Sequence, residues 1–265
     1  MKMSVCLTLI VTVGAILLLP VCTQRVWAKQ LKVSSDKEGL RQDVFVVHQS
    51  SLALGKTDLY LSENAGRLEA PKLALIIASR APSWNIVIYS TRKNQGYVIS
   101  GAEAKRDSLH MFSCSLATDQ GKPRPIHDAQ LRLDCLNIVM QTKNDQLTTG
   151  DTIIFQDRTK KVVRQAILKI ATPCKIQPAL QTFINFLFDL DKYPGLPLAL
   201  ETQYKDGSSV TDLYTSSIEH TSKSPSFFAY PTGFKKASNK LEVMLSEDMN
   251  DTLEDLWGSV PKKEK

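Results

Sequence analysis

The 265-residue chain lacks the short motifs by which most enzyme and metal sites are recognised. It contains no G-x-S-x-G nucleophile elbow, no C-x-x-C pair and no glycine-rich phosphate loop, and its four histidines stand without ligand spacing. These absences argue against an α/β-type serine hydrolase, a structural zinc site, a thiol redox centre and a nucleotide site. The sequence therefore predicts a protein that is not an enzyme and holds neither a metal nor a cofactor.

The amino-terminal segment has the three regions of a secretory signal peptide. A short basic start precedes an apolar run over residues 5–21, and Val26-Trp27-Ala28 supplies an A-x-A-like cleavage site. The apolar run is at or below the roughly 20 residues that a spanning helix needs. We therefore expect cleavage after Ala28 and a periplasmic or secreted mature protein. Retention of the segment as a membrane anchor is one alternative, and lipidation of Cys22, whose preceding residues fit a lipobox poorly, is another.

Charge is mild and evenly mixed along the chain. Cleavage would remove Lys2 and Arg25 and no acidic residue, so the formal net charge would fall from +6 to +4. No basic stripe carries interleaved aromatic residues, which argues against a nucleic-acid partner. The end of the chain, Lys262-Lys263-Glu264-Lys265, fits a solvated terminus better than a membrane-binding patch.

Three cysteines would remain after cleavage, namely Cys114, Cys135 and Cys174. In an oxidising compartment two of them can form a disulfide, but their spacing does not say which two. His110 lies four residues before Cys114, so on a helix the two would share a face and could act as base and nucleophile. No neighbouring residue orients this histidine, and we prefer a packed or disulfide-bonded Cys114.

Most of the mature chain has the pattern of short β-strands. Extended runs rich in β-branched and aromatic residues recur at intervals of roughly 8–12 residues, with turn residues and no helices between them, which favours an antiparallel sheet over βαβ units. Thr118–Asp128, which contains a glycine and two prolines, is predicted to be a loop. The predicted strands are Asp43–Gln49, Thr57–Ser62, Ala65–Ala70, Leu73–Ala78, Trp84–Tyr89, Tyr97–Ile99, Gln130–Gln141, Thr152–Gln156, Lys161–Ala171, Pro197–Tyr204 and Ser209–Ile218.

Helices are few and lie mostly late in the chain. The clearest is Ile176–Leu190, whose apolar residues repeat at helical spacing on one face. Leu241–Trp257 is a second amphipathic stretch, and Ala102–Phe112 is a weakly patterned third. The sequence thus predicts a mainly β member of the α+β class, with a curved antiparallel sheet or unclosed β-barrel covered by one or two α-helices.

Two predicted strands are apolar on both faces. Trp84–Tyr89 and Leu73–Ala78 carry large apolar groups at successive positions, although side chains alternate between the faces of a strand. One face can pack against a helix, and the other must be covered by more protein or by an apolar ligand. The candidate ligand-binding residues are Trp84, Ile86 and Ile88 on the strand and Phe183 and Phe188 on the predicted helix.

The order of several short motifs resembles the periplasmic lipoprotein-carrier superfamily, that is, LolA/LolB-like and related outer-membrane lipoprotein-sorting proteins. The motifs are Gly195-Leu196-Pro197-Leu198, an Asp206-Gly207 hairpin, and Phe228-x-x-Pro231-x-Gly233-Phe234. The amino-terminal strands, including Ala65-Gly66-Arg67-Leu68-Glu69, follow the same order, so the likeness covers residues 43–235 loosely. Ala102–Asp128 and the chain after Phe234 have no counterpart.

This resemblance implies an unclosed barrel whose helices cover a cavity for acyl chains, and transport or binding without catalysis. It also implies an arginine whose contacts help to hold the cover closed; Arg67 is the matching position and is therefore also a candidate ligand-binding residue. An exposed strand arginine with no such role is the alternative for Arg67. The implied partners are a hydrophobic ligand or a lipoprotein, with transient contact to a membrane or an envelope protein.

These observations divide the chain into a signal peptide (1–28), a flexible segment (29–42), a carrier-like domain (43–236) and a carboxy-terminal helix with a basic tail (237–265). The predicted function is binding or carriage of an acyl-bearing ligand outside the cytoplasm. The alternative is an envelope interaction or structural protein whose core is filled by its own side chains.

Overall fold

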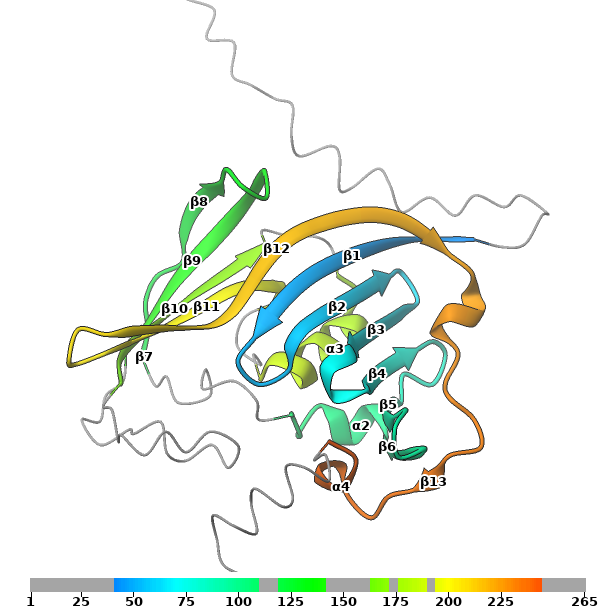
Figure 1. Cartoon of the computed structure of the whole chain (residues 1–265). Coiled ribbons are helices and arrows are strands. Elements are labelled where there is room, and N and C mark those ends of the chain that lie inside the picture. The colour runs from blue at the N-terminus through cyan, green and yellow to red at the C-terminus, as the bar shows by residue number, and fades with distance from the viewer. Residues whose placement is uncertain (1–40, 110–118, 142–162, 172–175, 190–193, 245–265) are drawn as a thin grey trace, which may run out of the picture.

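The computed structural model describes residues 41–109, 119–141, 163–171, 176–189 and 194–244, and it has a single curved sheet as its framework (Figure 1). Thirteen strands form this sheet, and every pair is antiparallel except β13 with β6. The mainly β, unclosed architecture predicted from the sequence is confirmed. The predicted signal peptide and the strand Thr152–Gln156 lie outside the described residues.

The first half of the sheet is a run of neighbouring antiparallel strands in chain order. Each strand pairs with the next along the chain, so tight turns suffice to connect them. The elements are β1 (Gln42–Ser51), β2 (Gly55–Ser62), β3 (Ala65–Ala70), β4 (Leu75–Arg80), β5 (Ile86–Ser90) and β6 (Gln95–Ile99), with the short 3₁₀ helix η1 (Pro71–Leu73) between β3 and β4.

The second half joins the first through the longest strand, β12 (Ser209–Lys223), which pairs with β1 along one edge and with β11 (Leu196–Tyr204) along the other. Beyond β11 follow β10 (Val163–Ala171) and β9 (Leu133–Gln141). The turn Lys205–Ser208 closes the predicted Asp-Gly hairpin. Register shifts interrupt the pairing of β1 with β12 and of β11 with β12, and such bulges bend a sheet.

Short strands lie at both edges of the sheet. β13 (Lys235–Lys236) pairs with β6, while β7 (Asp119–Gln120) and β8 (Arg124–Asp128) both pair with β9. The expectation of a loop over Thr118–Asp128 was therefore wrong. Its prolines suggested a loop, but an edge strand tolerates Pro125 because one side of such a strand needs no ladder hydrogen bonds.

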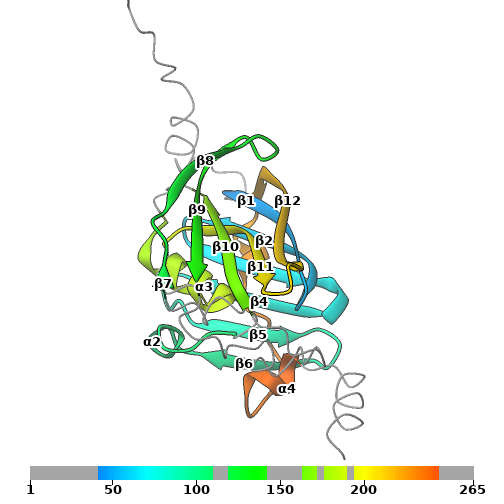
Figure 2. The ribbon, with the colours of Figure 1, turned by 90° about the vertical axis from the view of Figure 1, so that its left-hand side faces the viewer.

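The main helix is α3 (Pro178–Phe188), which confirms the helix predicted over Ile176–Leu190. α2 (Gly101–Ala104) covers only the start of the helix predicted over Ala102–Phe112, because residues 105–109 are not helical, so that prediction was wrong over most of its length. α4 (Lys240–Met244) is the described start of the helix predicted over Leu241–Trp257, and η4 (Pro225–Phe228) follows β12. In the second view the strands of the second half lie in front of α3, so the sheet curves around this helix (Figure 2). None of the helices within the described ranges is long and apolar enough to cross a bilayer.

The face of the sheet that is turned toward α3 is called the concave face here, and it carries Leu59, Leu68, Ile77 and Ile88. These side chains share one buried cluster with the apolar residues of α3 and with Val243 and Met244 of α4. The opposite, convex face carries Tyr60 and Arg67, which alternate with the concave residues. A smaller cluster of Val44, Val46, Ala65 and Phe228 lies on that face.

Candidate functional site

Four of the predicted ligand-binding residues lie together between the sheet and α3. Ile86 and Ile88 project from β5, Phe183 and Phe188 come from α3, and all four belong to the main apolar cluster. Their exposed fractions are 1%, 0%, 1% and 3% respectively. In this structure the protein's own side chains cover these four residues.

Trp84 lies at the edge of the same region. It precedes β5 with a backbone φ of 51°, is partly buried, and packs against the main cluster. A positive φ is uncommon for a bulky residue, so the surrounding structure holds this turn in place. Trp84 therefore borders the covered residues without being enclosed with them.

Helix α3 meets the sheet most closely at Gly66 of β3. A Cβ atom built on Gly66 would lie 2.5 Å from two ring carbons of Phe183 and 3.2 Å from Cδ1 of Leu180. Only a residue without a side chain permits this approach, so the glycine sets the distance between helix and sheet. The apolar residues of α3 occur around much of its circumference, as in helices that are enclosed by protein.

A group of polar side chains interrupts the apolar concave face. Gln49 and Thr57 are paired neighbours on β1 and β2, and Gln49 also faces Thr215 of β12. All three are buried. Gln49 Nε2 donates to the carbonyl oxygen of Pro197 at 2.9 Å and to Thr215 Oγ1 at 3.1 Å. This group, Gln49, Thr57 and Thr215, is called the polar cluster below.

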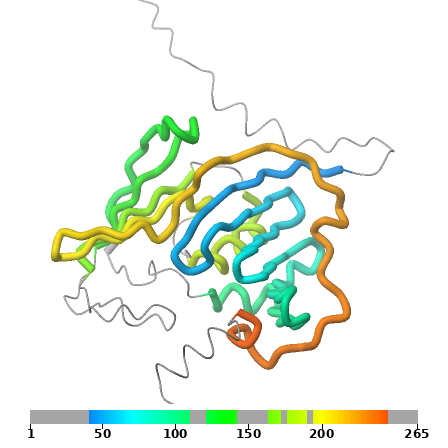
Figure 3. Tube along the Cα trace, viewed as in Figure 1, coloured from blue at the N-terminus to red at the C-terminus, as the bar shows by residue number. Residues whose placement is uncertain are grey.

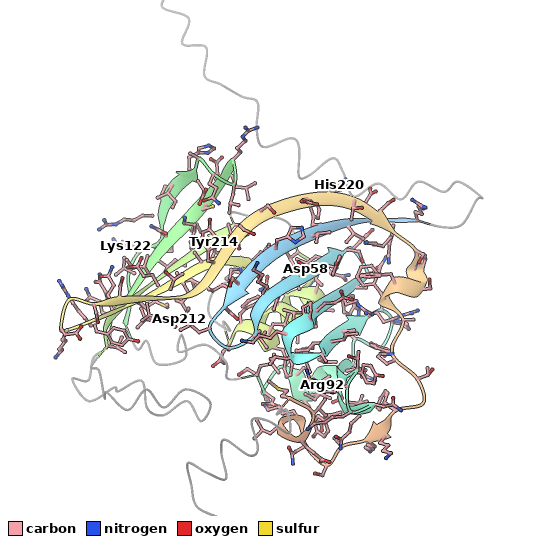
Figure 4. The ribbon with its side chains drawn as sticks, viewed as in Figure 1. Asp58, Arg92, Lys122, Asp212, Tyr214 and His220 are labelled. Carbon is pink, nitrogen blue, oxygen red and sulfur yellow. The ribbon has the colours of Figure 1, made fainter. Side chains whose placement is uncertain are left out.

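Asp212 lies farther along β12, at a bulge opposite β11. It is the extra residue between the paired positions Thr211 and Leu213, and its carboxylate accepts a hydrogen bond from the Thr202 hydroxyl. Figure 4 places Asp212 beside the turn that joins β1 and β2, where its carbonyl oxygen accepts from Leu52 N at 3.2 Å. Burial raises the pKa of the Asp212 carboxyl above its ordinary value, and the Thr202 hydrogen bond partly offsets this effect.

The Asp212→Asn variant is expected to lose part of the pH dependence of stability. Because the folded protein holds the Asp212 proton more tightly than the unfolded chain does, ionisation costs stability as the pH rises above the ordinary aspartate pKa of about 3.9. Asparagine can still accept from Thr202 and carries no charge. In urea titrations between pH 4 and pH 7, the free energy of unfolding of the variant should therefore rise relative to that of the wild type as the pH rises. Parallel plots of this free energy against pH would contradict the prediction.

Arg67 lies on the convex face, away from the other predicted ligand-binding residues. Its Nε donates to Glu69 Oε1 at 2.7 Å, and its Nη1 donates to the carbonyl oxygen of Phe227 at 2.9 Å. The guanidinium also stands over the Phe227 ring, 4.8 Å from its centroid. Arg67 therefore binds η4, and the structure does not bring it into contact with α3.

Residues Ser224–Ala237, called the strap below, run along the first half of the sheet after the end of β12, as the orange trace of Figure 3 shows. Phe227 packs edge-on against Tyr60, and Phe234 occupies the space that a Cβ on Gly96 would fill. The Tyr230 hydroxyl donates to Asn85 O at 2.8 Å. The Phe-x-x-Pro-x-Gly-Phe motif thus attaches the strap to the convex face, and β13 ends it at the edge of β6.

An Arg67→Met variant is expected to loosen the strap and to lower the free energy of unfolding by about 2 kcal/mol, because the hydrogen bond to Phe227 O, the cation–π contact and the ion pair with Glu69 are lost together. Lys223→Met is the matched control, since Lys223 Nζ stands over the rings of Phe227 and Tyr60, at 5.1 and 5.5 Å, and it makes these cation–π contacts without the bond to the Phe227 carbonyl. Amide hydrogen exchange at Phe227 and Ala229 should accelerate much more in Arg67→Met than in the control. Equal acceleration in both would contradict the assigned role.

Of the three candidate disulfide cysteines, only Cys135 lies within the described residues. It carries a free, fully buried thiol in β9, and burial raises its pKa to about 11, with the nearby Asp128 carboxylate adding to the effect. A thiol of this kind is a poor nucleophile at neutral pH. Cys114 and Cys174, together with His110, lie outside the described residues.

The polar cluster was not singled out from the sequence, and the Phe228-x-x-Pro231-x-Gly233-Phe234 motif gave no sign that the strap lies on the convex face. One signal for the cluster was available, because Gln49 follows Val47 at the spacing that places both on one face of a strand. A glutamine at such a core position calls for a hydrogen-bond partner. No local signal reveals the partners Thr215 and Pro197, which lie more than a hundred residues away in the chain.

Comparisons with known proteins leave the family open. No protein-family model matches the chain, and no curated protein matches it. Among solved structures, an uncharacterized conserved protein from Thermus thermophilus is similar over 74% of this chain and 90% of that chain, with 11% sequence identity and a TM-score of 0.30. A likeness at that level assigns neither a family nor a function.

Proposed function

We propose that the chain is an exported, non-catalytic protein that binds or carries a hydrophobic ligand with an acyl chain. The acyl chain would lie on the concave face, in the space that α3 occupies in this structure. Ile86 and Ile88 would contact it from the sheet, and Trp84 would border it. Export rests on the amino-terminal sequence, and a lipid or lipoprotein as ligand rests on the resemblance to the lipoprotein-carrier superfamily.

The observation that carries the proposal is the apolar character of the contact between α3 and the concave face. The side chains that α3 contributes to the core are leucine, isoleucine and phenylalanine, and the strand residues opposite are equally apolar. Hydrophobic contact is non-directional and scales with buried area. An acyl chain can therefore cover such a surface in place of a helix, whereas it could not replace a network of hydrogen bonds, and the cost of exposing the apolar side chains of α3 lowers the apparent affinity of the ligand.

The polar contacts of α3 lie mainly near its two ends. Gly195 N donates to Gln181 Oε1 at 2.9 Å, Leu109 N donates to the carbonyl oxygen of Phe186 at 2.9 Å, and Gln177 donates to the carbonyl oxygen of Glu63. Displacement of α3 would exchange the apolar contacts of the sheet with the helix for contacts with the ligand, and it would break these hydrogen bonds. The ligand would then select a minor, open state of the protein.

Chain-length dependence of binding tests the proposal directly. Octanoate, decanoate and dodecanoate should displace a fluorescent fatty-acid probe from the purified protein, with affinity rising about fourfold for each added methylene, as about 0.8 kcal/mol per buried CH₂ requires. Butanoate, which has the same carboxylate and little apolar surface, is the control. Absence of displaceable binding, or equal affinity across the series, would remove the proposal, and native mass spectrometry would reveal any lipid that copurifies.

The burial of the candidate residues favours a second function. Ile86, Ile88, Phe183 and Phe188 are at most 3% exposed, as expected for an envelope interaction or structural protein with a filled core. On this alternative α3 is a permanent part of the core. The chain-length series would then show no binding, although the protein is folded and stable.

A further inference from the structure

We infer that the polar cluster, through Gln49, accepts a hydrogen bond from a neutral N–H or O–H group close to the acyl chain of the ligand. The inference rests on the proposed function and narrows the class of ligand. Fatty amides with an N–H and fatty alcohols carry such a donor and are favoured over ligands that lack one. It depends on one side chain whose hydrogen-bonding capacity is only partly used.

Gln49 occupies a core position. It is 3% exposed and lies on the concave face between Thr57 of β2 and Thr215 of β12. The next concave residue on β1 is Val47, which belongs to the main apolar cluster. The glutamine therefore stands where the apolar surface meets a few polar groups, an arrangement that orients ligands in mostly apolar sites.

The amide of Gln49 is satisfied at one end only. Its Nε2 donates to Pro197 O and to Thr215 Oγ1, at 2.9 and 3.1 Å, whereas its Oε1 is buried and has no hydrogen-bond partner in the described part of the chain. Rotating the amide would place two acceptors, Oε1 and Pro197 O, against each other. The contact with Pro197 therefore fixes the orientation of the Gln49 amide, and the atom left without a partner is the acceptor Oε1.

An acceptor of this kind selects the chemistry of its partner. A buried carbonyl oxygen without a donor costs roughly 1–3 kcal/mol, and a ligand that supplies a donor recovers part of that cost. The neighbouring side chains, Thr57 and Thr215, are uncharged, so a neutral donor suffices and an ion would be left without a counter-charge. Amides with an N–H and alcohols meet this requirement, while esters and tertiary amides do not.

Two matched ligands test the inference on the full chain. Dodecanamide and N,N-dimethyldodecanamide share the acyl chain and the carbonyl, and only the first has N–H groups. In probe-displacement titrations, the ratio of their affinities should be about tenfold more favourable to dodecanamide in the wild type than in Gln49→Met, which keeps the side-chain length and lacks the acceptor. Ser62→Ala, which removes a buried hydroxyl of β2 outside the polar cluster, is the control and should keep the wild-type ratio.

The outcomes separate this inference from the proposed function. Binding of both amides with the same affinity ratio in wild type and Gln49→Met would overturn the role of Gln49 and leave acyl binding intact. If neither the two amides nor dodecanoate displaces the probe, both the role of Gln49 and the proposed acyl binding are overturned. If Gln49→Met does not fold, the wild type alone decides, because a preference for N,N-dimethyldodecanamide contradicts the donor requirement and a preference for dodecanamide supports it.

Discussion

A Phe183→Ala variant is expected to be about 3–5 kcal/mol less stable than the wild type and yet to bind an acyl probe more tightly. The loss of stability follows from the position of Phe183, which is 1% exposed and lies against Gly66 at the closest approach of α3 to the sheet. The gain in binding follows if the ligand and α3 compete for the concave face. Weaker docking of the helix raises the population of the open state, and the apparent affinity rises with it.

Phe228→Ala is the matched control for this experiment. Phe228 is the same residue type, is also 1% exposed, and belongs to the cluster on the convex face. Its truncation should cost a similar stability and leave the affinity for the probe unchanged. Urea denaturation and probe titration of both variants decide the matter. Equal changes in affinity, or a weaker affinity in Phe183→Ala alone, would contradict competition between ligand and helix.

A Gly66→Val variant is expected to lose about 3 kcal/mol of stability, at the upper end of the usual cost of overpacking a core. The first added carbon would already lie 2.5 Å from two Phe183 ring atoms and 3.2 Å from Leu180 Cδ1, and valine adds two more methyl groups to that carbon. Because a β-branched residue suits a strand, the loss cannot be attributed to backbone preference. Thermal and urea unfolding of the purified variant measure it.

Combining the two substitutions isolates their contact. If Gly66 and Phe183 set the helix–sheet distance together, Gly66→Val/Phe183→Ala should be at least about 1–2 kcal/mol more stable than the sum of the single effects predicts, since valine fills part of the space that phenylalanine leaves. Additive effects would show that Gly66 acts through some other neighbour. The double variant would also partly restore the docking surface of α3, so its probe affinity should fall between those of wild type and Phe183→Ala.

The regular part of the fold could be predicted from the sequence because strands and helices carry different periodicities. Asp43–Gln49, which is rich in β-branched and aromatic residues, lies in β1, and the alternating run Thr57–Ser62 lies in β2; the helical pattern after Ile176 corresponds to α3. The two-sided apolar strand at Ile86–Ile88 was correctly placed in the core. Each of these patterns is local, because it depends only on which apolar side chains of a short segment are buried.

Features that depend on distant pairing could not be predicted. Arg67 was grouped with the interior residues, but its position after Gly66 in β3 turns it to the convex face, where it meets Phe227. Pro125 suggested a loop and lies in an edge strand. The polar cluster joins β1, β2, β11 and β12, and its partners are decided by the curvature of the whole sheet. A short segment of sequence does not show which distant strands will pair.

The pairing of β1 with β12 has a consequence for how the molecule is made. β1 carries residues from the start of the domain, yet its partner in the sheet ends at Lys223, so Phe45 faces His220 across the ladder. Contacts between residues that lie so far apart in the sequence form late, because a long loop must close before these contacts contribute any stability. The two halves cannot be joined until nearly the whole domain has been synthesised. Until β12 has been made, the outer edge of β1 has no partner strand, so the amino-terminal half of the sheet stays open at that edge.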